Sequence, residues 1–225
     1  MDLVKYHKLP QEFPYCLSFD LAKVHTGWSF CRWDGDHLVV LETGVVDMSD
    51  AEDAMFWLEY CNALSAVFVK FLCHKDHMLV LKERMPMQNG LRSSIGALQA
   101  LAQCHAIFDL LTASYRVNIY DTLGVPAISE KALFRRLTGL DKVEKSDIRS
   151  FIRSHTDNQL PPDVSLDISD SIAVTMTLYQ HMATQDLTNR IKELKREQKR
   201  FKSTKKIAEI EAERDRLTAL LQGGL

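Results

Sequence analysis

The order of the predicted strands and helices constrains the fold of this chain more than any other feature. Three strand patterns come first, at residues 15–21, 26–33 and 37–46, with the hairpin signal Asp34-Gly35-Asp36 between the second and third. Helix and strand patterns then alternate, at 51–73 (helix), 77–83 (strand), 91–114 (helix), 116–120 (strand), 129–137 (helix), 144–155 (helix) and from 167 (helix). This order predicts an α/β fold in which a mixed five-stranded sheet is flanked by helices.

Composition permits such a fold and excludes several others. The 225 residues are 46% apolar and 26% charged, which suits a globular domain with an appendage rather than a disordered, collagenous or disulfide-rich chain. No apolar run approaches the roughly 20 residues of a membrane helix, and residues 1–5 lack the features of a signal peptide. We therefore expect a cytoplasmic protein with no membrane partner, whose five scattered cysteines are reduced.

One short segment, Cys73-His74-x-x-His77, contains residue types that bind zinc. It has no second ligand pair at a spacing usual for zinc sites. We interpret it as the solvated end of a helix.

Charge is distributed unevenly, which changes the meaning of the net charge of −2. Residues 1–189 carry 17 Lys/Arg and 24 Asp/Glu, a balance of −7, whereas residues 190–225 carry 11 and 6, a balance of +5. We therefore divide the chain into a body over 1–183 and a basic helical tail over 184–225. The tail could contact nucleic acid, associate with itself, or be a solvated charged helix.

The apolar residues of the tail fall in two helical phases, and the phase changes near Ser203-Thr204. Two arrangements fit this pattern. One is a helical hairpin, and the other is a coiled coil with a discontinuity.

Four acidic residues occupy positions where a carboxylate is costly. Asp20 and Glu83 each end a predicted buried strand, where a carboxylate loses hydration unless it is paired or binds a cation. Asp167 and Asp170 begin the last predicted helix of the body, and their spacing places them on one helical face. Singly, each acid also fits a turn, a cap or a helix-dipole role. Together they are ligands of the kind that Mg²⁺ prefers, and two such ions could promote phosphodiester hydrolysis.

Four segments form an ordered set of motifs. The first runs over 17–28 and contains Asp20, a short loop and Thr26-Gly27. The others are Glu83 with the segment 94–99, the segment 143–148 with Lys145, and the segment 166–173 with its Asp-x-x-Asp pattern. In this order the motifs resemble those of the RuvC-type Holliday junction resolvases, a branch of the RNase H-like superfamily. The resemblance covers about residues 15–183.

The resemblance implies a fold, a reaction and a set of site residues. It implies an RNase H-like nuclease domain over 1–183, and a homodimeric, Mg²⁺-dependent, structure-selective DNA endonuclease that resolves four-way junctions, its branched DNA partner, by paired nicks. The residues that would hold two Mg²⁺ ions, for which Mn²⁺ is an expected substitute, are Asp20, Glu83, Asp167 and Asp170. Lys145 would be a catalytic residue that steadies the phosphate. The basic residues expected to contact DNA are Lys131, Lys142, Lys145, Arg84, Arg92, Lys195 and Lys199.

The chain also departs from the family pattern. Arg84-Met85-Pro86-Met87 follows the second acid, where the family commonly has a base-stacking aromatic residue. The tail is not part of the family core. These departures suggest a divergent member, such as a phage or viral resolvase in a bacterial or virus-infected cell.

Three other functions remain open from the sequence. Another RNase H-like nuclease, acting on flaps, branched DNA or RNA–DNA hybrids, would keep the same acids. A nuclease-dead nucleic-acid-binding module is a second alternative, against which the complete set of four acids argues. An actin-like ATPase would need a second glycine-rich phosphate loop, which the nine glycines do not provide.

Overall fold

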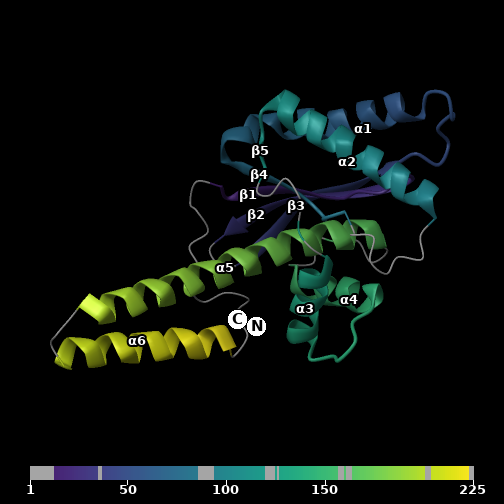
Figure 1. Ribbon diagram of the computed structural model, residues 1–225. Helices are drawn as coiled ribbons and strands as arrows, with labels where there is room; N and C mark the ends of the chain where they lie inside the picture. Colours follow the sequence, from purple (N-terminus) through teal and green to yellow (C-terminus); the bar gives the residue numbers. More distant parts are fainter. Residues whose placement is uncertain are drawn as a thin grey trace.

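The computed structural model describes residues 13–34, 37–85, 94–119, 125, 127–156, 160, 164–200 and 204–222. A five-stranded sheet in the order β3-β2-β1-β4-β5 lies at its centre (Figure 1). The strands are β1 (Tyr15–Asp20), β2 (His25–Asp34), β3 (His37–Asp47), β4 (Met78–Lys82) and β5 (Asn118–Ile119). β1, β2 and β3 pair antiparallel, whereas β4 pairs parallel with β1 and β5 pairs parallel with β4. The prediction of a mixed five-stranded sheet is confirmed.

Helices cover both faces of this sheet. They are α1 (Phe56–Phe71), η1 (a 3-10 helix, Leu72–His77), α2 (Ile95–Tyr115), α3 (Ala127–Thr138), α4 (Lys145–His155), α5 (Leu166–Arg200) and α6 (Thr204–Gln222). α1 and α2 lie on one face, and α5 lies on the other together with α3 and α4 (Figure 1). The flanking helices that the sequence predicts are therefore present.

The side chains of β1 alternate between the two faces, as the period of a strand requires. Leu17 and Phe19 belong to the buried cluster under α1 and α2. Cys16 and Ser18 lie on the other face, where Cys16 joins a second cluster and Ser18 bonds to α5. Asp20 continues this second series, so the strand delivers its carboxylate to the α5 side.

Two helices of the outer layer are more apolar than the sequence pattern predicts. By length and composition, Phe56–His77 and Ile95–Tyr115 fall within the range of membrane-spanning helices. This corrects the expectation that no apolar segment approaches that length. A core helix meets the same criteria, and both helices contribute buried aromatic side chains, such as Phe68 and Phe108, that contact each other against the sheet.

α5 runs without interruption from the body into the tail, and α6 returns beside it (Figure 1). Ile191, Leu194, Ile210 and Leu217 are buried where the two helices meet. Of the two arrangements expected for the tail, the described residues form the hairpin, and α6 begins at Thr204, where the apolar phase changes. The boundary expected at 183/184 lies within α5, so the tail is a direct continuation of a body helix.

Candidate metal and nucleic-acid site

Asp20 and Glu83 lie side by side at one edge of the sheet. Asp20 is the last residue of β1, and Glu83 directly follows β4. The two strands are parallel neighbours in which Phe19 is opposite Lys82, and the backbone N–H of Glu83 donates to the carbonyl oxygen of Phe19 at 3.2 Å. The strand pairing therefore brings together two carboxylates that are far apart in the sequence.

The first turns of α5 bring the other two acids to this edge. The hydroxyl of Ser165 accepts a hydrogen bond from the backbone N–H of Ile168 at 3.2 Å, which caps the start of the helix. Asp167 is half-buried, and Asp170 is only 5% exposed. The N-terminal end of α5 carries partial positive charge, which favours carboxylates in its first turn.

A glycine allows α5 to approach the sheet closely. Gly27 of β2 is opposite Asp20 of β1. A Cβ atom on Gly27 would overlap the carbonyl group of Asp167 and would lie 2.9 Å from the Cβ of Asp167. The backbone of Asp167 therefore rests directly on the strand beside Asp20, and any other residue at position 27 would force the two apart.

A buried hydroxyl network holds α5 in register with the sheet. The Ser18 hydroxyl donates to the carbonyl oxygen of Ser171 at 2.8 Å, and it is 2.8 Å from the Ser29 hydroxyl and 2.7 Å from the Thr175 hydroxyl. All four residues are fully buried. Because an unmet buried hydroxyl is costly, this network favours one position of the helix on the strands. The network was not predicted from the sequence, because it joins residues of β1, β2 and α5 that are far apart in the chain.

The acids interact strongly with one another. Burial, followed by the charges of Glu83 and Asp170, raises the pKa of Asp20 to about 8 against the opposing charge of Lys145. Burial also raises the pKa of Glu83, although a hydrogen bond from Asp20 and the charges of Lys145 and Lys131 oppose the shift. Burial raises the pKa of Asp170 as well, against the hydrogen bond from Lys145. The nearby lysines therefore supply too little positive charge for all of these carboxylates to be ionised at the same time.

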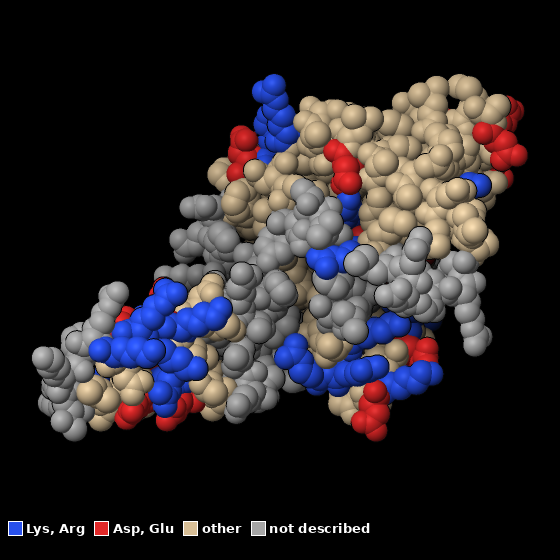
Figure 2. Space-filling model, in the orientation of Figure 1, with Lys and Arg blue, Asp and Glu red and all other residues tan. Residues whose placement is uncertain are grey.

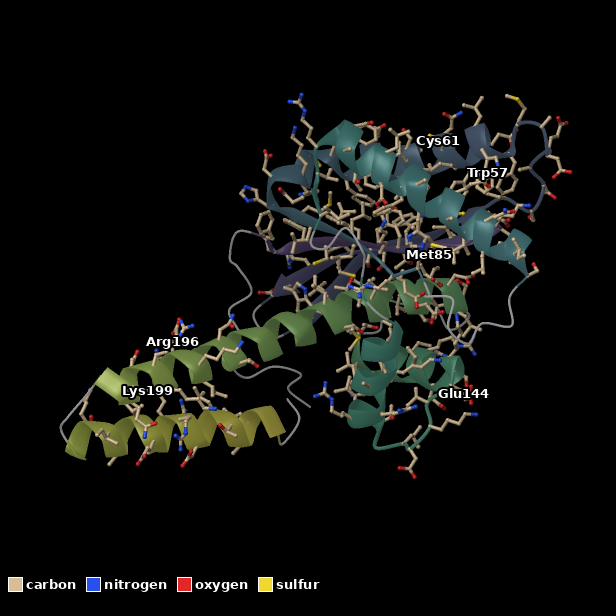
Figure 3. All side chains as sticks on the ribbon, viewed as in Figure 1. Trp57, Cys61, Met85, Glu144, Arg196 and Lys199 are labelled. Atoms are coloured by element: carbon tan, nitrogen blue, oxygen red, sulfur yellow. The ribbon has the colours of Figure 1, made fainter. Side chains whose placement is uncertain are left out.

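Lys145 supplies positive charge from the first residue of α4. The helix begins there because the side chain of Asp147 accepts a hydrogen bond from the backbone N–H of Glu144 at 2.9 Å, as in a capping box. Figure 3 labels Glu144 at this helix start. The Lys145 ammonium group contacts the Asp170 carboxylate. Burial alone would lower the pKa of Lys145, but the hydrogen bond to Asp170 and the charges of Asp170, Asp20 and Glu83 raise it.

The chemistry of this site fits a hard divalent cation. Within the described residues, no group of three His, Cys, Asp or Glu side chains is arranged as a ready metal-binding cluster. The Oδ1 atom of Asp170, however, is buried and has no hydrogen-bond partner in the described part of the chain. A buried carboxylate oxygen without a partner, beside carboxylates that repel each other, is stabilised by an oxygen-seeking cation such as Mg²⁺.

The other predicted site residues lie at different distances from this edge. Lys131 is exposed on α3 and acts electrostatically on Glu83. Arg84 follows Glu83, and its backbone N–H donates to the carbonyl oxygen of Val125 at 2.7 Å.

Lys142 is exposed between α3 and α4 and pairs with Glu144 at 2.6 Å. The remaining predicted residues are Lys195 and Lys199, which lie on the distal part of α5, and Arg92, which lies outside the described residues.

The segment with zinc-binding residue types forms η1 after α1. Its His74 ring packs on the Tyr15 ring, with centroids 4.6 Å apart. This contact is consistent with the interpretation of the segment as a helix end.

Comparison with known proteins shows which fold this is. Neither family models nor curated protein sequences match the chain. Thermus thermophilus RuvC, solved in complex with a Holliday junction substrate, is 14% identical with a TM-score of 0.56, over 72% of this chain and 91% of that one. A second T. thermophilus RuvC structure is 16% identical with a TM-score of 0.55, over 72% and 92%. The yeast mitochondrial Holliday junction resolvase reaches a TM-score of 0.48 at 12% identity, over 78% and 88%.

The sheet order, the flanking helices and the two T. thermophilus likenesses define an RNase H-like fold. Within that class, the chain has the fold of the RuvC-type Holliday junction resolvases. The fold that the motifs imply is confirmed.

Proposed function

We propose that this chain is a Mg²⁺-dependent, structure-selective DNA endonuclease that resolves four-way junctions by paired nicks. One observation carries the proposal: Asp20 and Glu83 lie at the ends of paired parallel strands, and Asp170 of α5, which contacts Lys145, is brought to the same edge of the sheet. Carboxylates would not be held together in this way for stability alone, since their burial and mutual repulsion oppose folding.

Each residue has a defined part in the proposed reaction. The four acids, Asp20, Glu83, Asp167 and Asp170, would hold Mg²⁺. The bound ions would lower the pKa of the attacking water and stabilise the leaving oxygen. Lys145 would place an ammonium group where negative charge develops on the scissile phosphate, and Lys131 would provide a second contact.

Paired nicks require two sites, so the proposal includes a homodimer. The outer layer of the molecule offers apolar surface for such a contact. Large exposed apolar side chains on α1 and α2 are Leu58 (54%), Val69 (54%), Ile95 (77%) and Leu110 (62%). Figure 2 shows largely uncharged surface over these helices, which supports an interface there rather than a DNA contact.

The test is cleavage of a mobile four-way junction, mapped to nucleotide resolution on both strands with Mg²⁺. Flap and RNA–DNA hybrid substrates are assayed in parallel. Symmetric paired nicks are the expected result, whereas cuts on one arm alone would favour a flap nuclease.

The matched variants are Asp20→Asn and Asp47→Asn, which each remove one carboxylate from the end of a strand. We expect Asp20→Asn to reduce cutting by at least about 1,000-fold, because a metal site contributes several kcal/mol, and to leave junction binding largely intact. Asp47 lies at the exposed end of β3 and bonds to Ser49, so its variant should cut normally. Normal cutting by Asp20→Asn would contradict the assignment.

A further inference from the structure

The distal part of α5 carries four basic residues that we call the basic stripe: Lys192, Lys195, Arg196 and Lys199. All four are exposed, and Figure 3 labels Arg196 and Lys199 among them. None has an ion-pair partner among the described residues, where the ion pairs of the tail use Arg190, Lys206 and Arg214 instead. Their spacing of three, four and seven residues places them together on one side of the helix.

The acids of the hairpin are directed elsewhere. Glu213 of α6 pairs with Arg190 at 3.4 Å, and Glu211 accepts a hydrogen bond from Gln198 at 2.7 Å. These contacts flank the apolar seam that contains Ile191 and Leu194. These two acids therefore bridge the helices, whereas Glu193 and Glu197 of α5 pair with Arg190, and the basic stripe is left in solvent.

The basic stripe and the candidate metal site lie on one continuous helix and share its phase. Asp167 and Lys192 are separated by about seven helical turns, and Asp167 and Arg196 by about eight. Residues separated by whole turns are on the same side of a helix. From Asp170 the stripe begins about 33 Å along the axis and ends about 44 Å along it.

We infer that the basic stripe binds the phosphate backbone of a duplex DNA arm at a distance from the cleaved bond; this inference rests on the proposed function. The stripe spans about 10 Å, or about three base pairs of backbone. All exposed residues of α5 between 188 and 199 are polar, whereas a protein interface needs an apolar core. A regular polyanion is therefore the partner that this surface fits.

A second basic area lies on the same face of the molecule. Figure 2 shows basic side chains gathered over the hairpin and again over α3 and α4. The exposed basic residues of that second area include Lys131, Arg135, Arg136 and Arg153. A duplex that crosses this face meets both areas, and an arm that follows α5 from the site reaches the stripe after about 10 to 13 base pairs.

The dependence on arm length provides the test. Fluorescently labelled four-way junctions with arms of about 8 or about 20 base pairs are titrated with the full chain in EDTA, across a range of KCl concentrations. The test variant is Lys192→Gln/Lys199→Gln. The matched control, Lys75→Gln/Arg116→Gln, removes the same charge from exposed positions at η1 and the end of α2.

With long arms, we expect the test variant to bind about 3- to 30-fold more weakly and the salt slope to fall by about 1 to 2, because each lost phosphate contact removes about 0.9 from that slope. With short arms, its affinity should equal that of the wild type. The control should match the wild type on both substrates, and Lys192→Arg/Lys199→Arg should retain long-arm binding. Circular dichroism verifies that the helices are intact.

Two results would overturn the inference. One is wild-type affinity and salt slope of the test variant on long arms, which would be the outcome if the stripe binds a protein or a second copy of the chain. The other is an equal loss on short arms. Failure of the proposed function is recognised separately: wild-type protein that binds long arms through the stripe but cuts no branched substrate would overturn the function and leave the stripe assignment standing.

Discussion

Aromatic rings pack the sheet face under α1 and α2, whereas the apolar core under α5 also contains a network of buried hydroxyl groups and a close glycine contact. On the first face, the Phe19 ring lies 5.4 Å from that of Phe68 and 5.3 Å from that of Phe108. On the second, Ser18 bonds to the backbone and side chains of α5, and Gly27 admits the backbone of Asp167.

The aromatic contacts mainly stabilise the fold, whereas the hydroxyl and glycine contacts mainly align α5 with the sheet. Apolar packing stabilises in proportion to buried area and tolerates small shifts. Hydrogen bonds and backbone contacts are directional, so they fix one register of α5 and with it the positions of its acids. Changes on the α5 face should therefore alter cleavage, and changes on the α1–α2 face should alter mainly stability.

Among changes that leave the four acids in place, the largest effect on cleavage is expected from glycine replacement on the α5 face. Gly27→Ala must displace Asp167 from Asp20, and we expect cleavage to fall about 100-fold, because misplacement of catalytic groups by 1 Å can have this effect. Calorimetric titration with Mg²⁺ should show weaker binding. Thermal melting identifies the folded fraction, and wild-type cleavage by this variant would contradict the role assigned to Gly27.

Gly44→Ala is the matched change on the other face. Its Cβ would lie 2.5 Å from Cζ2 of Trp28, a ring of the aromatic cluster. Such overpacking costs about 1–3 kcal/mol of stability, but the cleavage rate per folded molecule should stay unchanged. Gly96→Ala meets no atom within 4 Å and should alter neither property adversely. Loss of cleavage by all three variants would contradict the expected difference between the two faces of the sheet.

The next effect concerns two lysine–carboxylate pairs. Lys145→Gln removes the ammonium group that contacts Asp170, and we expect about 10- to 100-fold slower cleavage in single-turnover assays with saturating enzyme. Lys70→Gln breaks the exposed pair with Glu42 beside α1; it should cost less than about 1 kcal/mol of stability and leave cleavage unchanged. Equal effects of the two changes would mean that Lys145 is an ordinary surface ion pair.

Two core substitutions sharpen the comparison further. Ser18→Ala removes the hydrogen-bond partner of the buried Ser29 and Thr175 hydroxyls. Phe108→Leu removes part of the aromatic packing. Each should lower the free energy of unfolding by about 1–3 kcal/mol, measured by urea titration. Only Ser18→Ala should raise the Mg²⁺ concentration needed for half-maximal cleavage, because Ser18, unlike Phe108, bonds directly to α5. A similar Mg²⁺ shift in both variants would indicate that general loosening is the cause.

The smallest effect on cleavage is expected at His105 of α2. Burial, assisted by the charge of Lys82 and opposed by Asp109, lowers the pKa of His105 from 6.5 to about 4. The folded state therefore resists protonation, so the contribution of His105 to stability is complete above pH 6.5 and is lost as the pH falls toward 4. The loss should be on the order of 1–2 kcal/mol by pH 5.

Urea unfolding of wild type and His105→Gln at several pH values measures this contribution as the difference between the two curves. The variant should lose less stability than the wild type between pH 6.5 and 5. Parallel curves would show that His105 is not the group responsible. Cleavage at neutral pH should be the same for both.

Local signals predicted most of the fold. The alternation in β1, the Asp34-Gly35-Asp36 hairpin signal and the order of strand and helix patterns were enough for the mixed sheet. Element ends were less predictable. The sequence places the first helix over 51–73, but the Asp47 carboxylate accepts hydrogen bonds from the backbone and side chain of Ser49, and α1 begins only at Phe56.

The positions of the four acids at the ends of strands and at a helix start were predictable, whereas the contacts that hold α5 on the sheet were not. The order of the four acids follows from the chain, since each occupies the end of a strand or the start of a helix. The contact between Gly27 and Asp167 and the bonds from Ser18 to Ser171 and Thr175 depend on how a helix lies on a sheet. That geometry joins residues more than a hundred positions apart, and no local pattern specifies it.

The continuity of α5 also limits how such a chain can change its length during evolution. One residue deleted between 178 and 190 would rotate the distal helix by about 100° and would turn Lys192 away from the side that carries Asp167. Deletion of seven residues would leave a rotation of only about 20°. Insertions and deletions in this helix should therefore be tolerated in steps of whole turns, so that the reach of the tail can vary while its orientation is inherited.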